Sequence, residues 1–273
     1  MTIADVVLRH SQRGMNLLKE LLSDNMYEEA AAKLLQLKKG TILLATGFYV
    51  AGFAETDGPP GTFFLAKALK QLGFSPVIIT DSYCKSFFPG EEIPVCILEK
   101  GFSPADVLEQ YQPVSLISIE RCGRNIKGDY ANCRGISIAD HTVEIDRIFD
   151  LAKERGLYTV GIGDGGNEIG MGNLKDAISE RLSLVPCKTE VSDLLIATVS
   201  NWGAYGLCAA LSILSKTNLL ADYAEINAYI AYIVSQGSVD GIQKAHVPTV
   251  DGFAQEVEEE MVNALKACIT ATI

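Results

Sequence analysis

The chain has 273 residues, of which 48% are hydrophobic and 21% are charged, and its formal net charge at pH 7 is −11. This composition is that of a globular protein with ample material for a core. The negative charge argues against nucleic acid and anionic membrane surfaces as main partners. No apolar run approaches the roughly 18 residues that a membrane span needs. The N-terminal residues lack the charged start and apolar run of a secretory signal, so we expect a cytoplasmic protein.

The N-terminal residues predict two helices, one capped by Thr2 and continuing through Leu22, the other over residues 27–37. The pattern then changes to continuous apolar runs, which are typical of strands buried on both faces. Six such runs occur, at residues 41–46, 76–80, 93–98, 114–119, 158–162 and 194–199. Helical patterns lie between most of them, at residues 62–72, 103–110, 142–155, 174–182 and 204–215. This alternation predicts an α/β fold with a doubly wound, mostly parallel, Rossmann-like sheet of about six strands.

The remaining pattern predicts a single domain over residues 1–273, because no internal repeat or linker-like boundary is present. Residues 1–38 form N-terminal helices, 40–216 the sheet core and 217–273 the C-terminal helices. The C-terminal helices, predicted at 221–235 and 250–271, pack either on the sheet or on a second subunit. In the second case the protein is a homo-oligomer.

The seven cysteines are odd in number, and they form neither a C-x-x-C pair nor a cluster with histidine at metal-ligand spacing. They are typical of reduced thiols in a cytosolic protein. Cys122 and Cys133 have no histidine near them in sequence to lower their pKa, so we expect neither to be a nucleophile.

The segment GIGDGGNEIGMG, residues 161–172, is the most informative part of the sequence, because six of its twelve residues are glycine. It lies between the fifth predicted strand and a predicted helix. At such a place the N–H groups and the positive end of the helix dipole can converge on a small polar ligand. The alternative is a tight turn whose glycines only supply positive φ angles.

The spacing of Gly161, Gly163 and Gly166 also fits the dinucleotide-binding fingerprint. However, the loop lies late in the chain, and no acidic residue ends a strand about 20 residues further on, as the ribose contact needs. Asp164 and Glu168 would also repel a pyrophosphate. A loop rich in carboxylates instead favours an ammonium group or a metal ion.

Several polar segments follow the predicted strands, and parallel strands deliver such segments to one edge of the sheet. That edge collects six acids and two arginines: Glu55, Asp57, Asp81, Glu120, Asp164 and Glu168, with Arg121 and Arg124. Arginine is the natural receptor for a carboxylate, so this set complements a zwitterion. The structural alternatives are that Thr56 or Asp57 caps the next helix, and that residues 120–135 form a solvated loop. We expect structural roles for His141 and for Trp202.

Five strings of this sequence occur in the order found in a known family. They are Thr46-Gly-Phe, Glu55-Thr-Asp-Gly-Pro-Pro-Gly61, Glu120-Arg-x-Gly-Arg124, Tyr130-x-Asn-x-Arg-Gly135 and the glycine-rich loop. Over roughly residues 40 to 210 the chain thereby resembles the C-terminal domain of D-glutamate cyclase. The resemblance implies a hydro-lyase that dehydrates D-glutamate to 5-oxo-D-proline.

That reaction needs a base for the α-amine, a site for the oxyanion and an acid for the leaving water. The residues expected to be catalytic are Asp57, Asp164, Asn167 and Glu168. Those expected to bind substrate are Glu55, Thr56, Gly58, Glu120, Arg121, Arg124, Gly165, Gly166 and Asn201. In this scheme Arg121 or Arg124 holds the α-carboxylate, and Asp57, Asp164 or Glu168 attracts the ammonium group and accepts its proton. The N–H groups around Gly165, Gly166 and Asn167, with Asn201, bind the oxyanion.

We expect no redox or phosphate cofactor for this chemistry. Two alternatives remain open. The first is a metal-assisted enzyme acting on another small carboxylate or amino acid, in which Asp57, Asp164 and Glu168, with Asn167, bind Mg²⁺ or Ca²⁺. The second is a noncatalytic subunit that binds an amino acid.

Overall fold

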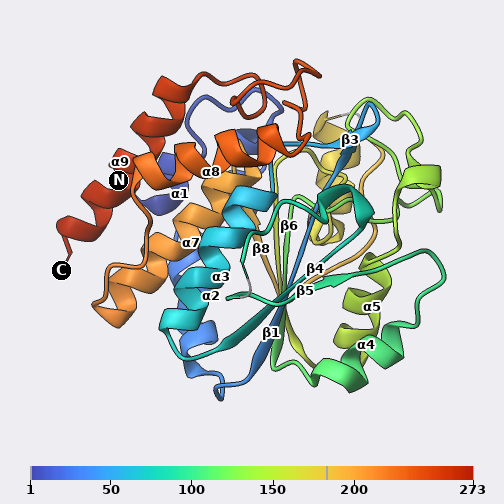
Figure 1. Ribbon diagram of the computed structural model, residues 1–273, viewed down its shortest axis with the longest axis horizontal. Helices are drawn as coiled ribbons and strands as arrows, with labels where there is room; N and C mark the ends of the chain where they lie inside the picture. Colours follow the sequence, from blue (N-terminus) through green and yellow to red (C-terminus); the bar gives the residue numbers. More distant parts are fainter. Residues whose placement is uncertain (1, 91, 183, 273) are drawn as a thin grey trace.

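A six-stranded sheet forms the centre of the computed structural model, which describes residues 2–90, 92–182 and 184–272 (Figure 1). Its order is β5-β4-β1-β6-β7-β8, and every neighbouring pair is parallel. The strands are β1 (Thr41–Thr46), β4 (Ser75–Thr80), β5 (Val95–Ile97), β6 (Ser115–Ile119), β7 (Tyr158–Gly163) and β8 (Asp193–Ile196). Each overlaps one of the six apolar runs. The predicted fold class is therefore confirmed.

Helices cover both faces of the sheet (Figure 1). One layer contains α2 (Met26–Gln36), α3 (Pro59–Gln71) and α7 (Ser200–Ser215). The other contains α4 (Pro104–Tyr111) and α5 (Asp146–Glu154). Outside α3 and α7 lie α1 (Ile3–Val7), α8 (Tyr223–Ser235) and α9 (Gln255–Thr270). Covered on both sides, α7 is apolar around most of its circumference and almost fully buried.

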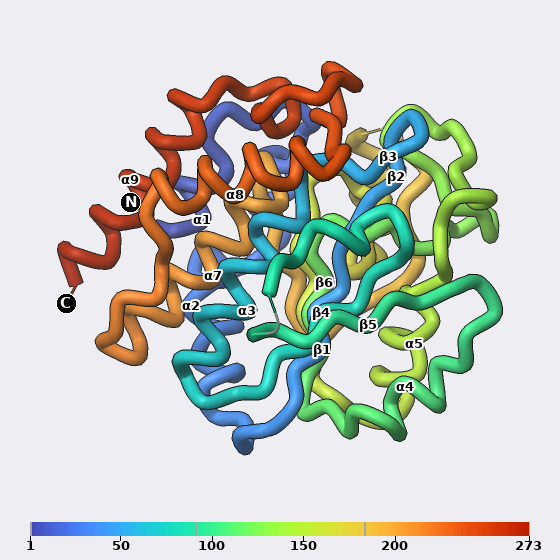
Figure 2. The backbone as a smooth tube through the Cα atoms, in the orientation of Figure 1, coloured from blue at the N-terminus to red at the C-terminus, as the bar shows by residue number. Residues whose placement is uncertain are grey.

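The two ends of the chain lie side by side, because α1 contacts α9 (Figure 2). The C-terminal helices thus pack on α3 and α7 of the same chain. Across the described ranges, no helix combines the length and apolar character needed to cross a membrane.

The N-terminal helix is much shorter than predicted. The Thr2 capping box is present, but α1 ends at Val7, and residues further along form only short 3₁₀ turns. His10 and Gly14 adopt left-handed φ angles of 61° and 82°, which end the helical path. The prediction of one helix through Leu22 was therefore wrong, and the segment instead crosses the edge of the sheet as a loop.

The segment after β1 contains a hairpin that the sequence pattern did not reveal. It consists of β2 (Tyr49–Val50) and β3 (Phe53–Ala54), which pair antiparallel. Ala51 and Gly52 between them have φ angles of 51° and 102°, as a two-residue type I′ turn requires. Residues 236–254 between α8 and α9 form the C-terminal loop. The hairpin is fixed to this loop by the Val239 N–H, which donates to the Ala54 carbonyl at 3.1 Å.

The sheet order creates a crevice between β1 and β6. These central strands are neighbours, and the chain runs outward from β1 to β4 and β5 but in the opposite direction from β6 to β7 and β8. Thr46 pairs with Ile119, so both strands end at the same level. The loops that follow β1 and β6 therefore lead to opposite sides. A place where the direction of the strand order reverses in this way is called a topological switch point, and α/β sheets bind ligands there.

The starts of α3 and α7 cap each other at this edge. The Asp57 carboxylate, just before α3, accepts from the N–H groups of Ser200 and Asn201 at 2.9 and 2.7 Å. In return, Asn201 Oδ1 accepts from Gly58 N and Gly61 N at 3.0 and 2.8 Å. The Asn201 amide also donates to the Thr56 carbonyl at 3.0 Å. This exchange satisfies the exposed donors of both helix starts.

We expect Asn201→Ala to lower the free energy of unfolding by about 3 kcal/mol, because two buried N–H groups and one carbonyl lose their partner. Urea denaturation measures the loss. Asn218→Ala, at an exposed position after α7, is the matched control and should stay within about 0.5 kcal/mol of wild type. Equal losses in both variants would contradict the capping role.

Candidate active site

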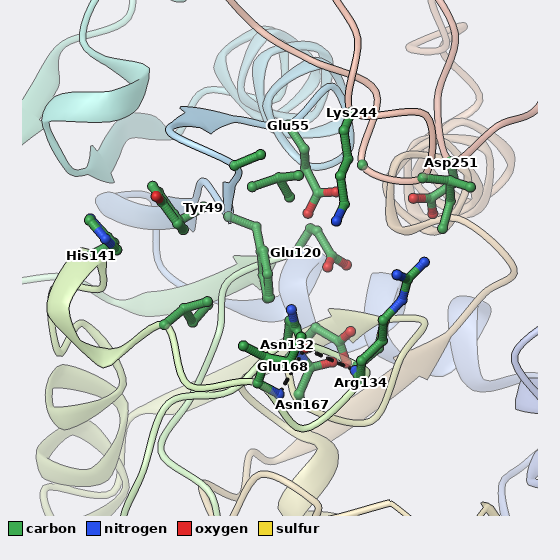
Figure 3. A pocket seen from close by; sticks show the side chains of 18 of the residues that line it. Tyr49, Glu55, Glu120, Asn132, Arg134, His141, Asn167, Glu168, Lys244 and Asp251 are labelled. Carbon is green, nitrogen blue, oxygen red and sulfur yellow. Dashed lines mark hydrogen bonds between the residues drawn. The ribbon is translucent and has the colours of Figure 1, made fainter.

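A cavity of about 360 Å³ opens at the switch point (Figure 3). Its walls come from the β2–β3 hairpin, the start of the loop after β6, the glycine-rich loop, residues 132–141 and the C-terminal loop. Among the predicted site residues, four line it: Glu55, Glu120, Asn167 and Glu168. The others lie beneath it or elsewhere.

Buried carboxyl groups form the floor of this cavity. Four of them line the cavity, namely Glu55, Glu120, Glu168 and Asp251. Asp57 and Asp164 are buried close to these four but do not line the cavity. Two groups of three have carboxylate oxygens within 4.8 Å of one another: Asp57, Asp164 and Asp251, and Glu120, Asp164 and Glu168. Burial is the main factor that raises the pKa values of Glu55, Asp57, Glu120, Asp164 and Glu168, since it disfavours the charged form.

Arg13 supplies positive charge to this floor. Its Nη2 lies 2.5 Å from Asp164 Oδ2, and the same guanidinium forms a salt bridge with Asp251. Burial alone would lower the pKa of Arg13, but the carboxylates of Asp164 and Asp251 raise it well above its usual value. Arg13 therefore stays charged, and its side chain is 25% exposed at the cavity wall.

Glu120 is both strained and buried. It directly follows β6 with a left-handed φ of 46°, a conformation that is costly for a residue with a side chain and often marks a functional site. Its side chain accepts a 2.5 Å hydrogen bond from Ser200 Oγ at one carboxyl oxygen. Burial, and then the nearby carboxylates of Glu168 and Asp57, raise its pKa well above the usual range. Its surroundings therefore favour the protonated form of Glu120 more than water does.

Glu168 is in a different electrostatic environment, although it lies on the same floor. Its two carboxylate oxygens accept hydrogen bonds from Gly165 N and Gly166 N, each at 2.8 Å. Burial raises its pKa, but Arg13 and these two N–H groups oppose the rise. Glu168 is thus held closer to its ionised form than Glu120.

The glycines of the loop allow this close packing. A Cβ on Gly165 would lie 2.7 Å from Glu168 Oε1, and a Cβ on Gly161 would lie 2.6 Å from the Ile169 carbonyl. The protein itself, not a ligand, approaches this backbone. The helix expected after the loop is also broken into short 3₁₀, α and π turns. The predicted oxyanion hole at Gly165 and Gly166 was therefore wrong, because their N–H groups are already bonded to Glu168.

Both predicted carboxylate receptors have other partners. Arg121 is buried, and its guanidinium donates to Asp81 at 2.6 Å and to the carbonyls of Gly47 and Val143. Arg124 lies 3.4 Å from Asp150 on α5, outside the cavity. The role predicted for these arginines was wrong, because the geometry of the loop after β6 turns both away from the crevice.

Several predicted residues hold the site together through buried hydrogen bonds. Asp57, Asn201 and Gly58 belong to the mutual caps, and the Thr56 hydroxyl donates to the Thr249 carbonyl at 2.7 Å. The Asn167 amide donates to the Ala131 carbonyl at 2.9 Å. Trp202 is fully buried, as expected. Its indole N–H donates to Glu258 at 2.5 Å.

Besides Arg13, two basic residues that were not predicted from the sequence lie on the cavity wall. Lys244 projects beside Glu55, and Arg134 reaches from the opposite wall toward Asp251 (Figure 3). Within the described ranges neither forms a salt bridge, so both charges can turn to a ligand. Arg134 belongs to the Tyr130-to-Gly135 string, which was a usable signal, whereas nothing local distinguishes Lys244 from other surface lysines.

The sequence matches the family described as "D-glutamate cyclase-like, C-terminal" over residues 3–266. The chain belongs to this family. A curated relative, the mitochondrial D-glutamate cyclase of Homo sapiens, is 32% identical over 211 residues. That match covers 67% of this chain but only 34% of the relative. This D-glutamate cyclase-like chain therefore spans about a third of the relative's length.

The carboxylates of this D-glutamate cyclase-like chain also suit a divalent cation. Oxygen donors from Glu120, Asp164 and Glu168 are of the type that Mg²⁺ and Ca²⁺ prefer. Asp164 Oδ1 is buried and has no hydrogen-bond partner among the described residues. An orphaned carboxylate oxygen costs stability, and a cation would relieve it. The donor set therefore fits a metal ion.

We expect Arg13→Met to lower the free energy of unfolding by about 3 kcal/mol at pH 8, because buried carboxylates lose their paired charge. The loss should shrink at pH 5. When the pKa of a carboxyl group is higher in the folded state than in the unfolded state, where it is about 4, the group stabilises the folded state at low pH. This stabilisation is complete below the unfolded-state pKa and is lost as the pH rises through the folded-state pKa. Removing Arg13 raises the folded pKa values further and steepens this dependence.

Denaturation of wild type and variant at both pH values measures the effect. Arg181→Met removes an exposed ion pair with Glu20 and is the matched control. It should cost less than about 1 kcal/mol, equally at both pH values. A pH-independent loss in Arg13→Met would show that packing, rather than charge, explains the contribution of Arg13.

Proposed function

We propose that the chain binds D-glutamate and catalyses its cyclisation to 5-oxo-D-proline with loss of water. The observation that carries the proposal is one cavity with buried acids on its floor and, on its wall, two basic side chains that form no salt bridge with any residue the structure describes. Membership of the D-glutamate cyclase-like family supports the substrate class.

The charge distribution fits the two ends of an amino acid. Glu168 and its neighbours attract the α-ammonium group, because the floor carries more carboxyl groups than Arg13 can neutralise. Lys244 and Arg134 line the same cavity and can bind the α-carboxylate. Binding therefore places the α-nitrogen against the acidic floor.

The different pKa environments on the floor assign the proton transfers. Glu168, whose ionised form is stabilised by Arg13 and two backbone N–H groups, accepts a proton from the α-ammonium and frees the amine for attack on the γ-carbon. Glu120 lines the cavity in surroundings that favour its protonated form, and it donates a proton to the oxygen that leaves as water. Two carboxyl groups whose pKa values are pushed apart are the usual form of acid–base catalysis in such sites.

We expect Glu120→Gln to lower kcat for D-glutamate by about 100-fold or more, since it removes the proton donor but keeps the shape and the Ser200 contact. The Kd for D-glutamate should change only a few-fold. Product formation by chiral chromatography and calorimetric titration measure the two quantities. Glu109→Gln, exposed on α4, is the matched control and should behave like wild type.

Comparison with L-glutamate in the same assays tests the stereochemical preference. If wild type neither binds nor converts D-glutamate, L-glutamate or another acidic amino acid, the proposal fails. If Glu120→Gln retains full turnover, the acid has been assigned to the wrong residue.

The second candidate function is binding of a divalent cation, favoured by the orphaned Asp164 Oδ1. A ligand at one hundred times its Kd stabilises the folded protein by about 2.7 kcal/mol. This candidate predicts that Mg²⁺ or Ca²⁺ raises the Tm by several degrees, that EDTA reverses the rise, and that Asp164→Asn abolishes it. An unchanged Tm, relative to NaCl of equal ionic strength, contradicts the candidate.

A further inference from the structure

The cavity has a charged end and an apolar end. Figure 3 shows Asp251 and Arg134 on one side, Tyr49 and His141 on the other, and Glu120 between them. The apolar end is formed by Phe48, Tyr49, Val50, Ile138 and His141. With about 360 Å³, the cavity falls in the range of about 300–1,000 Å³ that holds drug-sized ligands. Free glutamate is much smaller than such a ligand.

The apolar end is firmly built. The rings of Tyr49 and His141 stack with centroids 4.0 Å apart and planes within 7° of parallel. His141 Nδ1 lies 2.8 Å from the Tyr83 hydroxyl, which fixes the imidazole. Phe48 and Ile138 pack behind them in a small apolar cluster separate from the main core. This surface is therefore a preformed wall, suited to an apolar group.

The geometry of ring closure determines which part of the substrate reaches this wall. The new bond joins the α-nitrogen to the γ-carbon, so both atoms lie together near Glu120 and Glu168. A substituent on the γ-carbonyl then points away from the charged end. An apolar substituent there packs against the stacked rings of Tyr49 and His141, a contact that a free γ-carboxylate does not make.

We propose that the preferred substrates are γ-glutamyl amides, in which the γ-carbonyl carries an apolar amine or amino acid. This inference rests on the proposed function, because it concerns the same site and the same ring closure. The α-amine attacks the γ-carbonyl, a C–N bond forms, and the C–N bond to the amine leaving group breaks. Glu168 accepts the proton of the α-amine and Glu120 protonates the leaving nitrogen, so the products are 5-oxoproline and a free amine.

Three substrates test the inference: D-glutamate, D-γ-glutamylmethylamide and D-γ-glutamylbenzylamide. The methylamide removes the γ-charge without adding a ring, so it separates the loss of charge from contact with the apolar end. We expect kcat/KM for the benzylamide to exceed that of both other compounds at least tenfold, measured by chromatography of 5-oxo-D-proline and the released amine.

Tyr49→Ala should lower the benzylamide-to-methylamide ratio of kcat/KM about tenfold. The ratio is independent of how much of the variant is folded. Phe53→Ala alters an exposed aromatic residue of the same hairpin that does not line the cavity, and should leave the ratio unchanged.

The outcomes separate the two proposals. If D-glutamate is cyclised but the benzylamide is no better than the methylamide, the inference is overturned and the proposed function stands. If none of the three compounds is cyclised, the proposed function fails and the inference falls with it. If the benzylamide is favoured equally by wild type and Tyr49→Ala, the apolar end does not bind the substituent.

Discussion

Repulsion among buried carboxyl groups is the constraint on which the site depends. Two carboxylates a few ångströms apart repel by about 4 kcal/mol at an effective dielectric constant of about 20, and six such groups lie at the carboxyl edge of this sheet. The protein meets this repulsion in three ways: a salt bridge to Arg13, protonation, and donation from backbone N–H groups. Each carboxyl group relies on a different combination, so chemically identical side chains lie in different electrostatic environments.

The topology makes this concentration of charge possible. The acids come from segments that follow β1, β6 and β7 and from the C-terminal loop, which only the switch point brings together. The N-terminus of α7 points at the same place, where Ser200 N donates to Asp57 at 2.9 Å and to Asp164 at 3.2 Å. The positive end of this 16-residue helix favours negative charge there. Fold and charge therefore support each other.

The sequence predicted the sheet well because each strand is a local apolar run, buried on both faces. It also placed Glu55, Glu120 and Glu168 at one edge, since the parallel-strand rule needs only the position of each strand end. It could not reveal Arg13, whose partners lie 151 and 238 residues away. The sequence could not show which way the Arg121 side chain points either. An arginine at this position could equally turn toward Asp81 or toward the crevice, and only the structure shows that it contacts Asp81.

The glycine-rich loop was correctly predicted to lie at the site, but the group that its backbone contacts was not. Glycine lets something approach the backbone, and here that group is the Glu168 carboxylate of the protein itself. The N–H groups that could have received an anionic ligand instead hold an anion in place. A ligand group at this point must therefore offer positive charge or a proton. The basic side chains of Arg134 and Lys244 lie elsewhere, on the walls, where they suit a negatively charged group. The loop thereby fixes the polarity of the cavity, with carboxyl groups on its floor and basic side chains on its walls.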